Sequence, residues 1–249
     1  MSEKIYTIPI SEAFGECADD KTLGCPFCRL YNRLEANEID IILGASMMEP
    51  DIRMKTNEMG FCDVHFSRLL GGKSKLGLGL ILESHLADVR KEITDGRTAS
   101  LFGRKGQSAA RKLNSLSRSC YICAKLERTF EKMISNAVQF YSEDENFRST
   151  VQNVPYVCLP HLSMWLDSAK AELKKGYSDF YTEVSAPTLS YFDSLREDVS
   201  WFCKKFDYRY DSEPWGNSRD AVERAGKFLC GDLHQPVRPA IIQSTEDKT

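Results

Sequence analysis

The feature that most constrains this chain is a cysteine and histidine pattern that occurs twice. The first copy joins Cys25-Pro26-Phe27-Cys28 to Cys62-Asp63-Val64-His65, and the second joins Cys120-Tyr121-Ile122-Cys123 to Cys158-Leu159-Pro160-His161. Each copy reads C-x2-C, an insert of 33 or 34 residues, then C-x2-H. The copies are offset by 95 residues at the first pair and by 96 at the second. A matched duplication of this kind is much less expected by chance than one isolated C-x2-C.

These residue types at this spacing predict tetrahedral zinc sites. Two ligands three residues apart reach one metal ion from a turn or a helix start, and a second such pair completes the tetrahedron. We therefore predict two zinc ions per chain. The predicted ligands are Cys25, Cys28, Cys62, His65, Cys120, Cys123, Cys158 and His161. Four protein ligands leave no open coordination position, which disfavours hydrolytic zinc chemistry.

The pairing of the ligands is open to two interpretations. The matched offsets favour one site inside each copy, with Cys25 and Cys28 joined to Cys62 and His65, and the second copy arranged alike. The alternative is an interleaved arrangement, in which the pairs cross over between the two copies.

Composition favours a reduced, cytoplasmic protein. Nine cysteines are an awkward number for a secreted disulfide framework, whereas six metal-bound thiolates and three spare thiols suit a reducing compartment. The N-terminus lacks the pattern of a signal peptide, and no apolar run is long enough to span a membrane. The formal net charge of -3 provides no global attraction to nucleic acid or to an anionic membrane.

Apolar periodicity predicts an all-α fold. Apolar residues step by threes and fours through most of the chain after Cys25, interrupted in the first such stretch only at Glu38. We expect an extended segment at IYTIPI, near the N-terminus, and a turn at Glu49-Pro50-Asp51. Pro187 is expected to separate a segment at 177–184 from a helix at 188–206. The other expected helices lie at about 25–46, 62–70, 76–93, 121–141, 161–173 and 219–229.

The duplication also predicts the domain organisation, which is two tandem zinc-bound helical repeats plus a C-terminal helical extension. The repeats are expected at 25–95 and 120–190, after an N-terminal segment at 1–24 and on either side of a basic linker at 96–119. C-terminal helices are expected at 191–231. A disordered tail is expected at 232–249, because it carries prolines and ends in charged and small residues.

A structural zinc scaffold that binds a protein partner, without catalysis, is the function that this organisation favours. The first alternative is a thiol redox protein or redox switch, because a CPFC at a helix start is typical of glutaredoxin. However, the polar residues before Cys25 do not form the apolar strand which that fold needs, and the second motif, CYIC, lacks the proline.

Nucleic-acid binding is the second alternative. The interval 96–126 contains no acidic residue, although the chain holds 36 of them. Its basic residues are Arg97, Arg104, Lys105, Arg111, Lys112, Arg118 and Lys125. Apart from Phe102 and Tyr121 it holds no aromatic residue for base stacking, so a solvated surface is the favoured interpretation. Cys17, Cys203, Cys230 and His234 have no matched partners and receive no role.

The chain also resembles an uncharacterised bacterial family known only as a domain of unknown function. The resemblance is carried by CPFC, MEPDIRMKTNEMGFCDVH, CYIC, CLPH and KFDYRY with the following DSEPWG, and it runs from IYTIPI to the last helix. It implies a bacterial, cytosolic, all-helical protein in which the predicted cysteine and histidine ligands belong to the family pattern. It implies no activity.

Overall fold

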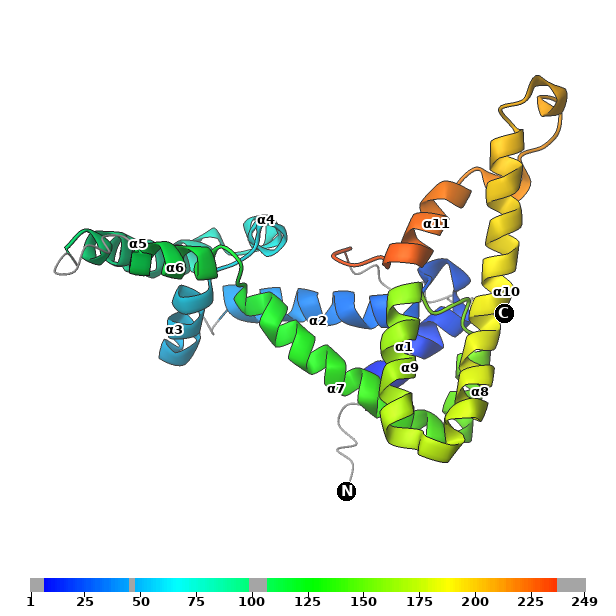
Figure 1. The fold of residues 1–249 in the computed structure, drawn as a ribbon, viewed down its shortest axis with the longest axis horizontal. Coiled ribbons are helices and arrows are strands. Elements are labelled where there is room, and N and C mark those ends of the chain that lie inside the picture. Colours follow the sequence, from blue (N-terminus) through cyan, green and yellow to red (C-terminus); the bar gives the residue numbers. More distant parts are fainter. Residues whose placement is uncertain (1–6, 45–47, 99–106, 237–249) are drawn as a thin grey trace, which may run out of the picture. The chain divides into compact units, whose positions relative to one another are not determined.

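The computed structural model describes residues 7–44, 48–98 and 107–236, and this part of the chain is all-α, without a strand (Figure 1). The prediction of an all-α fold is therefore confirmed. The α-helices are α1 (Thr7–Asp19), α2 (Pro26–Leu43), α3 (Pro50–Met59), α4 (Asp63–Gly71), α5 (Lys75–Thr98), α6 (Gln107–Leu116), α7 (Tyr121–Glu143), α8 (Glu145–Asn153), α9 (Leu159–Leu173), α10 (Tyr177–Lys204) and α11 (Ala221–Cys230). No described helix is both long and apolar enough to cross a membrane.

Two segments that we expected to be extended or turned are helical instead. In the IYTIPI segment, Thr7–Ile10 belong to α1, because Ile10 and Phe14 lie one turn apart and are both fully buried; residues 5 and 6 lie outside the described residues. The turn expected at Glu49-Pro50-Asp51 is the beginning of α3. Pro50 occupies the first turn of α3, where its missing N–H costs nothing, and Asp51 also lies in that turn.

Pro187 lies inside α10 and does not separate two helices, so that prediction is wrong. A proline inside a helix removes one hydrogen bond and costs about 3 kcal/mol. Packing on both sides of it offsets this cost, since Phe180 and Val184 before it and Leu195 after it are buried.

The chain forms two compact units that do not follow the two sequence repeats. Unit 1 comprises residues 1–32 and 130–249, and unit 2 comprises residues 33–129. Helices α2 and α7 therefore each contribute to both units. The predicted repeats at 25–95 and 120–190 are a duplication seen in the sequence. That they form two zinc-bound helical repeats stays a prediction.

Unit 1 is built around a connected group of aromatic side chains. Phe14 of α1 lies edge-on to Phe27 of α2, with ring centroids 5.1 Å apart, and Phe27 lies edge-on to Trp165 of α9 at the same separation. Trp165 in turn contacts Phe180 of α10 at 5.2 Å. All four rings are buried, so the helices of unit 1 share one core. Phe27, the third residue of the CPFC motif, lies at its centre.

Unit 2 has a smaller aliphatic core. Its fully buried apolar side chains include Ile42 of α2, Leu69 of α4 and Ile81 of α5. Helices α3 and α5 are also joined by polar contacts: Arg53 donates to the carbonyl of Leu80 at 2.8 Å, and Ser84 donates to Asn57 at 3.0 Å. Helix α6 lies within the predicted basic linker, of which residues 99–106 are outside the described residues.

Candidate metal centres

The eight predicted ligands lie in two groups, and the grouping crosses between the sequence copies. Cluster A consists of Cys25, Cys28, Cys158 and His161, and cluster B consists of Cys62, His65, Cys120 and Cys123. Each C-x2-C of one copy therefore meets the C-x2-H of the other. The preferred pairing of one site inside each copy is wrong, and the interleaved alternative is the one that the fold adopts.

Both clusters have the dimensions of a tetrahedral metal site. Around a zinc ion, sulfur ligands stand about 3.8 Å apart, and a sulfur and an imidazole nitrogen stand about 3.6 Å apart. In cluster A the Sγ atoms of Cys28 and Cys158 are 3.5 Å apart, and in cluster B those of Cys62 and Cys123 are 3.8 Å apart. The sulfur to Nδ1 distances are 3.1–3.7 Å in cluster A and 3.2–3.3 Å in cluster B. The residues present thus fit a metal ion.

Each of the four ligand pairs lies at the N-terminus of a helix. Cys62 and Cys158 are the N-caps of α4 and α9, while Cys25 and Cys120 directly precede α2 and α7. The second ligand of each pair lies three residues later, on the same face of the first turn. The positive end of each helix dipole points toward the pair, which stabilises thiolates. This arrangement offsets the one net negative charge that three thiolates and a neutral imidazole give around a divalent cation.

Cluster A is enclosed by aromatic side chains. The ring of His161 contacts both Phe27 and Phe130, at centroid distances of 6.0 and 5.1 Å, and these two rings also contact each other at 6.3 Å. The four candidate ligands are at most 3% exposed to solvent. Cluster A is therefore part of the unit 1 core.

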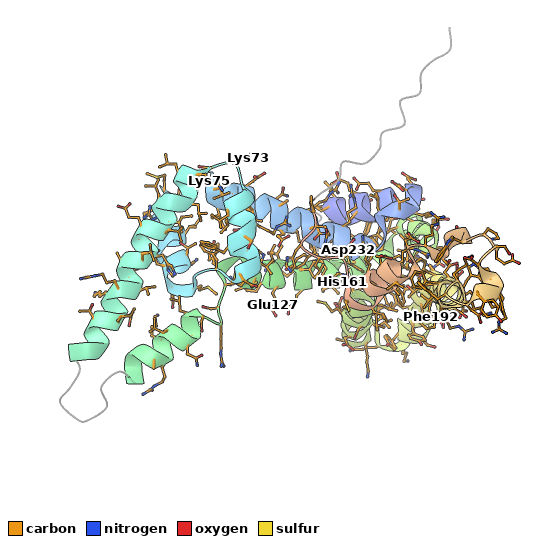
Figure 2. All side chains as sticks on the ribbon, turned by 90° about the horizontal axis from the view of Figure 1, so that it is seen from above. Lys73, Lys75, Glu127, His161, Phe192 and Asp232 are labelled. Atoms are coloured by element: carbon orange, nitrogen blue, oxygen red, sulfur yellow. The ribbon has the colours of Figure 1, made fainter. Side chains whose placement is uncertain are left out.

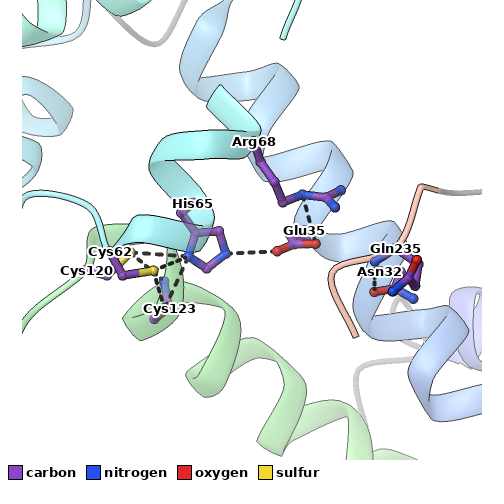
Figure 3. Close-up of polar contacts among 8 residues, drawn as sticks. All are labelled: Asn32, Glu35, Cys62, His65, Arg68, Cys120, Cys123 and Gln235. Atoms are coloured by element: carbon purple, nitrogen blue, oxygen red, sulfur yellow. Dashed lines mark hydrogen bonds and ion pairs between the residues drawn. The ribbon is translucent and has the colours of Figure 1, made fainter. Parts of the chain in front are cut away.

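A short segment after α11, residues 231–236, covers cluster A from outside the core. The backbone N–H of Asp232 donates to Sγ of Cys28 at 3.3 Å; Asp232 and the cluster residue His161 are both labelled in Figure 2. Asn32 holds the segment by donating to the carbonyl of Asp232 at 2.8 Å and accepting from the N–H of Gln235 at 3.3 Å (Figure 3). The predicted disordered tail therefore does not begin at 232, and residues 237–249 lie outside the described residues. We call residues 231–236 the covering segment.

Gly231 allows the covering segment to approach the sulfurs. Its φ is +82°, in the region that favours glycine, and a Cβ atom there would lie 3.7 Å from Sγ of Cys28 and 3.8 Å from Sγ of Cys158. The backbone after α11 thus passes directly over the cluster.

Cluster B has a buried carboxylate behind its histidine. Nδ1 of His65 faces the sulfurs, and its Nε2 lies 3.0 Å from Oε1 of Glu35 on α2 (Figure 3). The other oxygen of Glu35 lies 3.2 Å from Nε of Arg68. Both His65 and Glu35 are fully buried. A carboxylate behind a histidine fixes the ring orientation and tautomer that a metal requires.

Glu35 was not among the residues predicted from the sequence. The signal that could have found it is an acidic residue within an otherwise apolar-spaced helix, as noted for Glu38. Glu38 pairs with Lys125 at 2.8 Å, so one cation of the basic interval is neutralised.

The thiols of cluster A oppose one another's ionisation. Burial raises the pKa of Cys25, but hydrogen bonds from Cys158, Cys28 and His161 outweigh it and hold that pKa well below its usual range. Hydrogen bonds with Cys158 and Cys25 raise the pKa of Cys28, and the hydrogen bond with Cys25 raises the pKa of Cys158. A bound cation removes this conflict because it stabilises all three thiolates together.

Cluster B shows the same opposition. Burial acts to raise the pKa of Cys120, but the hydrogen bond from His65 and the backbone hydrogen bonds from Cys123 and Cys62 together outweigh it and lower that pKa to about 6. Burial and the neighbouring charge of Cys120 raise the pKa of Cys123. Burial acts against a charged His65, yet its contacts with Cys120 and Glu35 raise its pKa to about 10. Without a metal, therefore, the imidazole retains a proton that a bound cation would displace.

The spare cysteines do not extend either cluster. Among the described residues, no candidate metal group includes Cys17, Cys203 or Cys230. Cys17 is buried in α1, whereas Cys203 and Cys230 are exposed.

Comparison with known proteins places the chain in a family but adds no activity. The chain belongs to a family of unknown function, DUF6062, whose model matches residues 1–236. The predicted resemblance to a domain-of-unknown-function family is thus confirmed. No curated protein and no solved structure matched the chain.

Proposed function

We propose that this protein is a structural zinc scaffold that holds two zinc ions, one in each cluster, and acts as a protein-interaction module without catalysis. The observation that carries the proposal is the presence of two complete four-ligand sets. In each set the ligand atoms lie within 4.8 Å of one another, although they come from segments far apart in the sequence. Three thiols and one imidazole are the donor set that zinc prefers over harder cations.

The zinc ions would act as cross-links between helix starts. In cluster A a metal ion would join the start of α2 to the start of α9, and in cluster B it would join the start of α4 to the start of α7. Since each cluster holds four protein ligands, the metal would have no position for a substrate, which supports a structural role.

Metal content tests this proposal directly. The protein is purified without added metal and examined by native mass spectrometry and elemental analysis. We expect two zinc ions per chain, because structural sites of this type hold zinc tightly. A content below one zinc per chain would rule out the scaffold.

The thiol-oxidoreductase alternative is weakened by the surroundings of the CPFC motif. Cys25 and Cys28 are each 3% exposed and lie against Cys158 and His161. A catalytic dithiol must meet its disulfide substrate at the surface. We therefore expect no turnover of a disulfide substrate, and activity that Cys25→Ser abolishes would favour the alternative.

A protein partner is supported by an exposed aromatic loop of unit 1, residues 205–215. Phe206 and Tyr208 are 75% and 87% exposed. Lys205 holds the loop in shape, because its Nζ donates to the carbonyls of Tyr210, Asp211 and Glu213 at 2.6–3.0 Å. Exposed aromatic residues on a fixed loop are typical of protein interfaces.

The loop's role can be separated from folding. Replacing Phe206 and Tyr208 with serine should leave the thermal midpoint and the zinc content unchanged, since these rings are exposed. A clear drop in the midpoint would mean that the rings are structural, and the loop would then no longer support a partner.

The cytoplasmic location predicted from the cysteine content is part of the same proposal, because free exposed thiols and zinc thiolates persist in a reducing compartment.

A further inference from the structure

We propose that cluster B is an oxidation site at which a hydroperoxide converts Cys62 and Cys123 to a disulfide and releases the metal ion, while cluster A stays intact. This inference rests on the proposed function, because it requires that both clusters hold zinc. It concerns the Cys62 and Cys123 pair, whereas the redox alternative from the sequence concerns the CPFC and CYIC pairs.

The two clusters differ in how far their cysteines are exposed to solvent. Cys123 is exposed and Cys62 is half-buried. In cluster A, Cys158 is fully buried, and Cys25 and Cys28 are each 3% exposed. Oxidation of thiolates follows access to the oxidant, so cluster B should react first.

The two accessible thiols of cluster B are also suitably placed for a disulfide. Their Sγ atoms are 3.8 Å apart and come from different segments, the start of α4 and the start of α7. Bond formation requires the sulfurs to approach to about 2.05 Å. The other two ligands, Cys120 and His65, are buried, at 6% and 0% exposure. Oxidation therefore removes the two more exposed ligands, Cys62 and Cys123, and leaves the two buried ones.

The chemistry balances with a hydroperoxide as the oxidant. The thiolate of Cys123 attacks the outer peroxide oxygen, the O–O bond breaks, and the alkoxide or hydroxide that leaves takes up a proton. The thiolate of Cys62 then attacks the sulfur of the resulting sulfenic acid, and hydroxide leaves and is protonated to water. Two sulfurs each lose one electron and the peroxide gains two. The metal loses two of its four ligands and dissociates.

Hydrogen bonds beside the cluster would keep the segments before α4 and α7 next to each other after the metal ion leaves. The N–H of Tyr121 donates to the carbonyl of Gly60 at 3.0 Å, and the hydroxyl of Ser119 donates to the carbonyl of Met59 at 2.7 Å. These bonds join the segments before α4 and α7 independently of the metal. A thiol reductant could therefore restore the original site, and the change would be reversible.

The test uses the full chain with the exposed spare thiols removed by Cys203→Ser and Cys230→Ser. Its zinc content is counted by native mass spectrometry before and after treatment with hydrogen peroxide, and disulfides are mapped by peptide mass spectrometry. We expect two zinc ions before treatment and one afterwards, together with a disulfide between Cys62 and Cys123. Dithiothreitol with added zinc should restore the second ion.

A matched pair of variants locates the reaction. Cys123→His keeps a zinc ligand but removes the reactive thiol, so zinc release by peroxide should slow by at least about tenfold. Cys203→His, made in place of the parent's Cys203→Ser, introduces a histidine at an exposed cysteine outside both clusters and should leave the rate unchanged. The disulfide map of the parent chain does not depend on how either variant folds.

The possible results are distinguishable. Loss of both ions, a disulfide formed first within cluster A, or no zinc release would each overturn the inference while leaving the scaffold intact. A count of one before any peroxide is added would overturn this inference alone, because it requires both clusters to hold zinc. A count below one would overturn the proposed function as well.

Discussion

Clusters A and B contain the same set of donors, yet their surroundings differ in almost every respect. Cluster A lies in an aromatic core and is covered by the segment at 231–236. Cluster B has an exposed cysteine on one side and a buried carboxylate and guanidinium on the other. Under the proposed function, an identical ligand pattern would serve two purposes. We interpret cluster A as the permanent cross-link and cluster B as the adjustable one.

The largest expected difference between the clusters is in stability. Cys158→Ser removes a fully buried ligand and should release the ion of cluster A. The expected cost is about 3–5 kcal/mol, because metal loss leaves polar groups buried in the core. Cys123→Ser removes an exposed ligand and should cost about 1–2 kcal/mol. Urea denaturation followed together with zinc content measures both. Equal costs, or the reverse order, would contradict the assignment of cluster A as the permanent cross-link.

The next effect concerns the carboxylate behind His65. Glu35→Gln weakens the hydrogen bond to Nε2 and should lower the zinc affinity of cluster B by about 10–100-fold, leaving cluster A unchanged. Competition with a chelator of known affinity measures the change. Glu38→Gln is the matched control, since Glu38 is also a buried acidic residue of α2 but pairs with Lys125. If both variants weakened cluster B equally, Glu35 would have no specific role in orienting His65.

The smallest effect concerns the covering segment of cluster A. Asn32→Ala removes two hydrogen bonds that hold residues 231–236, so zinc should leave cluster A about five-fold faster in a chelator challenge, in line with about 1 kcal/mol. Asn57→Ala, in unit 2, also removes two side-chain hydrogen bonds, those with Asp88 and Ser84, and serves as the control. An unchanged rate of release from cluster A would mean that the segment does not protect it.

The cysteines and histidines that form the two clusters, and the helix starts that carry them, could be predicted from the sequence, because both depend on short-range spacing. Two ligands three residues apart at a helix start are recognisable in any single pair. The helix beginnings after Cys25, Cys62, Cys120 and Cys158 follow from the same local pattern.

The pairing could not be predicted, and the reason is specific. Both C-x2-C pairs carry the same donors, and so do both C-x2-H pairs, so no local feature distinguishes the partner of each. The offsets of 95 and 96 residues are compatible with either pairing. Tertiary packing, which includes the contact of Phe27 on α2 with Trp165 on α9, brings Cys25 and Cys28 to Cys158 and His161.

The role of residues 231–236 was missed for a related reason. Prolines and small polar residues predict a disordered tail, but the contacts of Asp232 and Gln235 with Cys28 and Asn32 join positions about two hundred residues apart. Pro187 within α10 is a similar case, in which burial on both sides outweighs a local preference.

Zinc counts of two double variants test the crossed pairing most directly. Cys28→Ser with Cys158→Ser changes only cluster A, whereas Cys28→Ser with Cys62→Ser changes both clusters. Native mass spectrometry should therefore find one zinc ion in the first variant and none in the second. One ion in the Cys28 and Cys62 variant, with none in the Cys28 and Cys158 variant, would show that each sequence copy holds its own metal and would contradict the interleaved architecture.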